Sequence, residues 1–116
     1  MIKIITRPDD QMRYSTAGDW YHDGDTLSID VVEQNDPRHS LLIAIHELVE
    51  ALLCAHNGVT QETVDHWDMI LCADSDEPAD VPHCPYAREH QTAEVIERIM
   101  AQALGVDWID YTRSIG

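Results

Sequence analysis

The sequence predicts an α+β fold, with a small N-terminal antiparallel sheet followed by three helices. Its 116 residues have the length of one domain, which we take to span residues 1–116. The first third contains short runs in which apolar and polar residues alternate, whereas the apolar residues beyond Ser40 recur with a helical period. With 44% hydrophobic and 25% charged residues, the composition is that of a globular protein.

The β-rich part covers residues 1–34. A first strand is predicted over residues 2–6 and a second over residues 12–16. A hairpin turn is predicted at Asp23-Gly24-Asp25, because glycine accepts the positive φ angle of a tight turn. In the arm that follows, residues 26–32, the alternation has the period of a half-buried strand.

The helices are predicted over residues 37–57, 60–73 and 86–104, each bounded by residues that begin or end helices. Between the last two lies an acidic stretch, residues 73–85, whose prolines forbid a helix. The tail at 106–111 offers apolar side chains that would cover an edge of the core.

The charge of the chain excludes several classes of partner. There are 22 Asp and Glu residues against 7 Lys and Arg, a formal net charge of -15. Direct nucleic-acid binding needs a basic surface, so we expect none. An anionic membrane surface is disfavoured for the same reason, and no membrane is expected as a partner. The three cysteines, an odd number without a secretory signal, predict free thiols and a cytoplasmic protein.

The informative segment for function is SLLIAIHELVEALLCAH, within the first predicted helix. This helix is apolar nearly all round, which is typical of a buried central element. Its interior carries three ionisable residues, His46, Glu47 and Glu50. His46 and Glu50 are four residues apart and therefore project from one face. An isolated buried carboxylate costs several kcal/mol, and a bound cation would compensate it.

The pattern reads as HExxE, a variant of the HExxH zinc signature. His46 and Glu50 are the predicted metal ligands, and Glu47 is the predicted general base that activates a metal-bound water. A catalytic zinc site usually has a third protein ligand, and His90 on the last helix is our candidate. Glu94, one helical turn later, would be either a further ligand or a partner that orients an imidazole. The expected cofactor is zinc.

With this motif, the stretch GDTLSIDV…HELVEALL, within residues 18–57, resembles the minimal zincins, compact zinc metallopeptidases. The resemblance implies a zincin-like fold, zinc-dependent hydrolysis of a peptide or protein substrate, and an edge strand that binds extended substrate beside the motif helix. In this chain Glu50 replaces the second histidine of that family, and His90 would supply it. The chain as a whole resembles small phage and prophage proteins that carry HELVEALLC-type motifs and bring no established activity.

Two other functions remain open from the sequence. Glu47-x-x-Glu50 followed by Glu62-x-x-Asp65 resembles the MazG-like nucleotide pyrophosphohydrolases, which hold Mg²⁺ (or Mn²⁺) between acidic helices. Against it, Glu62 and Asp65 are predicted to face solvent, and no Lys or Arg lies between residues 38 and 88 to bind phosphate. Alternatively, the charge would suit an acidic phage-type binding or inhibitor protein without catalysis. Whether the metal is structural, and the oligomeric state, also stay open.

Overall fold

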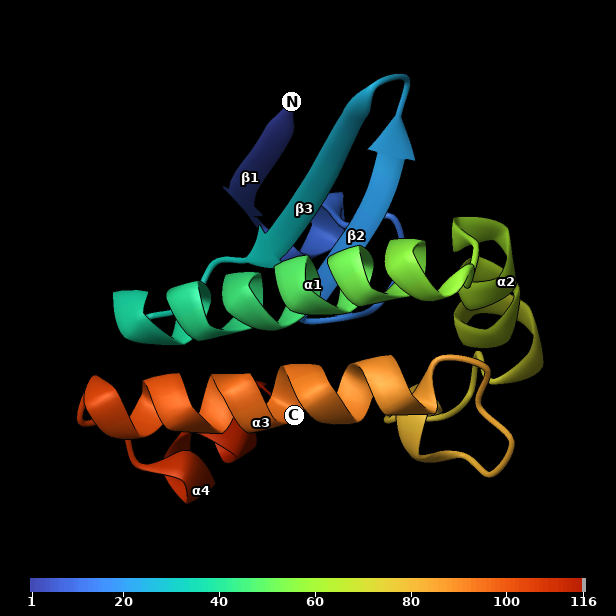
Figure 1. Ribbon diagram of the computed structural model, residues 1–116. Helices are drawn as coiled ribbons and strands as arrows, with labels where there is room; N and C mark the ends of the chain where they lie inside the picture. Colours follow the sequence, from blue (N-terminus) through green and yellow to red (C-terminus); the bar gives the residue numbers. More distant parts are fainter. Residues whose placement is uncertain (116) are drawn as a thin grey trace.

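A computed structural model describes residues 1–115 and has the predicted α+β architecture: a three-stranded sheet followed by four α-helices (Figure 1). The strands come first, with α1 lying across the sheet and α3 lying beside α1 (Figure 1). Their bounds are β1 Ile2–Arg7, β2 Gly18–Asp23, β3 Thr26–Val32, α1 Pro37–Asn57, α2 Gln61–His66, α3 Ala87–Ala103 and α4 Trp108–Ile115.

The sheet is mixed, which corrects the prediction of a purely antiparallel one. Its strand order is β1-β3-β2. β2 and β3 form the predicted antiparallel hairpin around Gly24, whose φ of 60° is left-handed. β1, however, pairs with β3 in parallel. The long connection between β1 and β2 allows the chain to return along the far side of β3, which leaves β1 at the other edge.

The strand predicted over residues 12–16 does not form, and this segment is an irregular connection. Its side chains are instead committed to tertiary contacts. The Arg13 guanidinium binds Asp19 at 2.7 Å and Asp65 at 3.0 Å, and the Tyr14 hydroxyl donates to Asp68 at 3.2 Å. These side-chain contacts attach the connection to β2 and to the segment after α1, without backbone pairing to a strand.

Helix α1 has the bounds that the sequence predicts, residues 37–57. Asp36 caps its first turn by accepting a hydrogen bond from the Arg38 backbone N–H at 2.9 Å, and Gly58 ends it in the left-handed conformation, with φ 74°. By length and composition alone α1 is apolar enough to cross a membrane, but here it packs on β2, β3 and α3. It is therefore the central helix of the core.

The second predicted helix, residues 60–73, is divided into two segments. Thr60 caps α2, and the chain then continues as a π-helical turn over Trp67–Leu71. The Trp67 indole N–H donates to the Pro78 carbonyl oxygen at 2.8 Å, which attaches the acidic stretch to this turn. α3 agrees with the prediction of residues 86–104 to within one residue at each end.

Helix α4 is an element that the sequence did not predict. Asp107 caps it, since its carboxylate accepts from the Asp110 backbone N–H at 2.9 Å. The predicted role of this tail in covering the core is nevertheless correct, because Tyr111 is completely buried. The rest of the core consists mainly of apolar side chains from the sheet, α1 and α3, among them Trp20, Ile29, Val31, Leu42 and Ala93. Cys54, Cys72 and Cys84 are free thiols, as predicted.

Candidate metal centre

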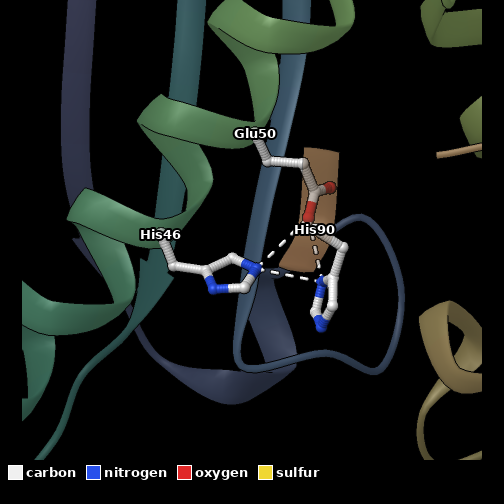
Figure 2. Close-up of side chains that lie close together, drawn as sticks. All are labelled: His46, Glu50 and His90. Atoms are coloured by element: carbon white, nitrogen blue, oxygen red, sulfur yellow. Dashed lines mark hydrogen bonds and ion pairs between the residues drawn. The ribbon is translucent and has the colours of Figure 1, made fainter. Parts of the chain in front are cut away.

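The three predicted ligands lie together between α1 and α3. His46 and Glu50 project from successive turns of α1, and His90 projects toward them from the first half of α3 (Figure 2). Three atoms form a nearly equilateral triangle. His46 Nε2 is 3.2 Å from Glu50 Oε2 and 3.1 Å from His90 Nδ1, and His90 Nδ1 is 3.1 Å from Glu50 Oε2.

These separations suit a small cation. Ligand atoms at 2.0–2.1 Å from a tetrahedral zinc ion lie about 3.3–3.4 Å from one another. The triangle needs an expansion of only about 0.2 Å to reach that spacing. The group can therefore hold a metal ion with little movement of the two helices.

The atoms that point away from the triangle are held by other residues. His46 Nδ1 is 2.7 Å from Glu97 Oε1, and the Tyr111 hydroxyl donates to the other oxygen of Glu97. Glu50 Oε1 accepts a hydrogen bond from the Trp20 indole N–H at 3.1 Å. A carboxylate that accepts from the outer N–H of a metal-binding imidazole fixes its tautomer and orientation. The site is thus supported from three elements: β2, α3 and α4.

The charge state of the metal-free site follows from this arrangement. When the Nδ1–H of His46 donates to Glu97, its Nε2 carries a lone pair that faces the Glu50 carboxylate and Nδ1 of His90. Because these atoms are all hydrogen-bond acceptors, a proton or a cation must lie among them. Burial disfavours a charged His46, but its hydrogen bonds with Glu50 and Glu97 outweigh this and raise its pKa to about 11. Burial also opposes the charge on Glu50, yet His46 and His90 lower its pKa to about 2.

Glu47, the predicted base, lies on the side of α1 that faces the start of β2. A methyl group on Gly18 would come within 2.8 Å of Glu47 Oε1, so this glycine is what lets the strand approach the carboxylate. Burial, and then the negative charge of Glu50, raise the pKa of Glu47 well above its usual value. A raised pKa means that this carboxyl holds its proton to a higher pH than an exposed glutamate does.

A second carboxylate, partly buried, lies within electrostatic reach of Glu47. Asp68, in the π-helical turn, accepts hydrogen bonds from the Tyr86 hydroxyl and, at 3.2 Å, from the Tyr14 hydroxyl. Burial raises the pKa of Asp68 to about 6 despite these hydrogen bonds, and the charge of Glu50 contributes to the increase.

The other carboxylates considered from the sequence lie outside the triangle. Glu94 Oε2 is 3.8 Å from His90 Nε2, the ring nitrogen that points away from the triangle, and its side chain is 41% exposed. Glu94 is thus placed as a partner of His90. Asp65 binds Arg13, and Glu62 is exposed. Within residues 1–115, neither joins Glu47 and Glu50 in a group that could hold a metal.

Three supporting residues escaped the sequence analysis: Trp20, Glu97 and Tyr111. Glu97 did carry a signal, since it follows His90 by seven residues and so lies on the same face of α3. An acidic residue on that largely apolar face is the kind of feature that singled out Glu50. Trp20 and Tyr111 look like ordinary core aromatics in the sequence, and only the fold shows where their polar atoms point.

Comparisons with protein-family models, with curated proteins and with solved structures find no match to this chain. The function of the chain is therefore inferred from the site itself: its ligand atoms, the residues that support them and the carboxylates beside them.

Proposed function

We propose that this chain binds zinc through His46, Glu50 and His90 and is a zincin-like metal-dependent hydrolase in which Glu47 is the general base. The observation that supports this most is the triangle of ligand atoms, 3.1–3.2 Å on each side. Two imidazole nitrogens and one carboxylate oxygen are a common ligand set for catalytic zinc. Mg²⁺ prefers oxygen ligands, so the same set disfavours the nucleotide pyrophosphohydrolase.

Three protein ligands leave a fourth position of a tetrahedral ion open to water. The side chains of His46 and His90 are not fully buried, with 13% and 16% of their surface exposed. A bound zinc ion supplies Lewis-acid activation of a water molecule at neutral pH.

The protein's own groups would then handle the proton. Glu47 would accept a proton at its carboxylate from the attacking water and pass it to the leaving group of an amide or a similarly polarised bond. Glu97 would hold the His46 imidazole in the tautomer that presents Nε2 to the ion. The resemblance of the sequence to zincins favours a peptide or protein substrate.

The alternative for the same ion is a structural role, because the site also joins α1 to α3. Glu47→Gln separates the two, since Glu47 is not one of the three ligands. The experiment measures zinc content and the hydrolysis of a fluorescence-quenched peptide library by the wild type and this variant. We expect the variant to keep its zinc and to lose at least about a hundredfold in rate. Equal rates would refute the general base, and zinc without any hydrolysis would indicate a structural ion.

A further inference from the structure

Each of the two proposed ligands on α1 is held by a buried partner, whereas the ligand on α3 is not. His46 Nδ1 is 2.7 Å from Glu97, and Glu50 Oε1 accepts from the Trp20 indole N–H at 3.1 Å. The outer nitrogen of His90, Nε2, points away from the triangle (Figure 2) and makes no hydrogen bond within residues 1–115. The orientation of the His90 imidazole must therefore come from packing.

Tyr86 provides this packing, one helical turn before His90. The two rings meet edge to face, with their centroids 6.4 Å apart and their planes at 68°. Tyr86 is buried at the start of α3, where its carbonyl oxygen accepts a hydrogen bond from the His90 backbone N–H at 3.0 Å. Aromatic rings at this separation and angle attract one another, so the Tyr86 ring restricts rotation of the imidazole.

The Tyr86 ring is itself fixed at its far end. Its hydroxyl donates to Asp68 in the π-helical turn, a rare kind of turn that frequently lies at functional sites. Asp68 also accepts from the Tyr14 hydroxyl at 3.2 Å, which attaches it to the connection between β1 and β2. A continuous series of contacts thus leads from Tyr14 through Asp68 and Tyr86 to His90.

We propose that Tyr86 is a positioning residue for His90: its ring, fixed by Asp68, holds the imidazole in the plane that directs Nδ1 toward the ion. This role rests on the proposed zinc site and adds to it a residue that is not a ligand. A mobile imidazole would have to be ordered when the ion binds, and ordering a side chain costs conformational entropy. An imidazole that is already fixed avoids this cost, so the ion binds more tightly.

Tyr86→Phe and Tyr14→Phe are a matched pair that separates positioning from a general loss of stability. Each removes one hydroxyl that donates to Asp68, and the ring contact with His90 belongs to Tyr86. The dissociation constant for zinc is measured by competition with a chromogenic chelator at constant pH. We expect it to rise about tenfold in Tyr86→Phe, where the ring loses its anchor, and less than about threefold in Tyr14→Phe.

Cobalt(II) in place of zinc reports on the ligands themselves, which a change in stability does not affect. A tetrahedral cobalt site absorbs visible light strongly, and the absorption weakens when a protein ligand gives way to additional water. At saturating cobalt we expect the wild type and Tyr14→Phe to have the same spectrum. Tyr86→Phe should lose part of the absorption, because His90 is then only partly bound. Circular dichroism verifies that both variants fold.

A further measurement needs no variant. NMR relaxation of the histidine rings in the metal-free wild type compares His90 with His46, which Glu97 holds, and with the exposed His56. We expect the His90 ring to be as rigid as the His46 ring. A His90 ring as mobile as that of His56 would overturn the proposal.

The outcomes also distinguish the role of Tyr86 from the zinc site. Equal affinities and equal spectra for Tyr86→Phe and Tyr14→Phe would refute the role of Tyr86 and leave the zinc site intact. A wild type that binds neither zinc nor cobalt would refute the zinc site, and the role of Tyr86 with it.

Discussion

Glu97 is not one of the three proposed zinc ligands, yet the structure predicts that the affinity for zinc depends on Glu97. Glu97 accepts from His46 Nδ1 at 2.7 Å and is itself held by the Tyr111 hydroxyl, deep in the core. Glu97→Gln keeps the size of the side chain but removes its charge, so the His46 imidazole becomes a less basic ligand. Loss of such a partner typically weakens metal binding by 10- to 100-fold, or about 1.4–2.7 kcal/mol.

The assay is competition for zinc between the protein and a chromogenic chelator at constant pH. Glu94→Gln is a matched control, because Glu94 also approaches an outer imidazole nitrogen, but at 3.8 Å and with a 41% exposed side chain. We expect it to change the affinity by less than about threefold. If Glu97→Gln weakened zinc binding no more than Glu94→Gln, in a variant that is fully folded, the role given to Glu97 would be wrong.

Three further predictions concern the surroundings of the site. Gly18→Ala places a methyl group 2.6 Å from the Ile43 side chain, so we expect the free energy of unfolding in urea to fall by about 1–3 kcal/mol. An unchanged midpoint of urea unfolding would show that the neighbouring side chains move aside easily. Asp68 has a pKa of about 6 in the folded chain, against an ordinary value of 3.8, so the folded chain binds this proton more tightly than the unfolded chain does. The stability that protonated Asp68 contributes is therefore lost as the pH rises from about 4 to about 6. We expect the decrease in the free energy of unfolding over this pH range to be about 1–2 kcal/mol smaller in Asp68→Asn than in the wild type, when both are measured in the presence of a metal chelator. Identical dependence of the unfolding free energy on pH in the two proteins would contradict this. Trp20→Phe removes the donor to Glu50 Oε1 and should weaken zinc binding about tenfold, whereas wild-type affinity would show that this hydrogen bond does not support the ligand.

The parts of the fold that were predictable from the sequence are those with a local cause. Helix α1 has unambiguous signals at both ends, a cap at Asp36 and a glycine at Gly58, and its bounds agree with the prediction. The hairpin is equally local, because Gly24 specifies its turn. The parallel pairing of β1 has no such signal, since it depends on where the chain returns after an irregular connection. Helix α4 is short, and its tertiary packing through Tyr111 outweighs its weak local pattern.

The same distinction applies to the site. The spacing of His46 and Glu50 on one helix face is a property of any α-helix, so the sequence alone places these two side chains together. The position of His90 depends on α3 running antiparallel to α1 at a particular register, which no spacing rule provides (Figure 1). The supporting contact from Trp20 depends in addition on how α1 crosses the sheet.

The central claim, a zinc site made by α1 and α3, is tested most directly by counting metal ions. The measurement is elemental analysis of protein purified without added metal and without an affinity tag, beside His46→Ala prepared in the same way. We predict close to one zinc per chain in the wild type and almost none in the variant. A well-folded wild type without any metal would contradict the claim, as would a variant that keeps its zinc. Manganese or magnesium in place of zinc would favour the nucleotide pyrophosphohydrolase instead.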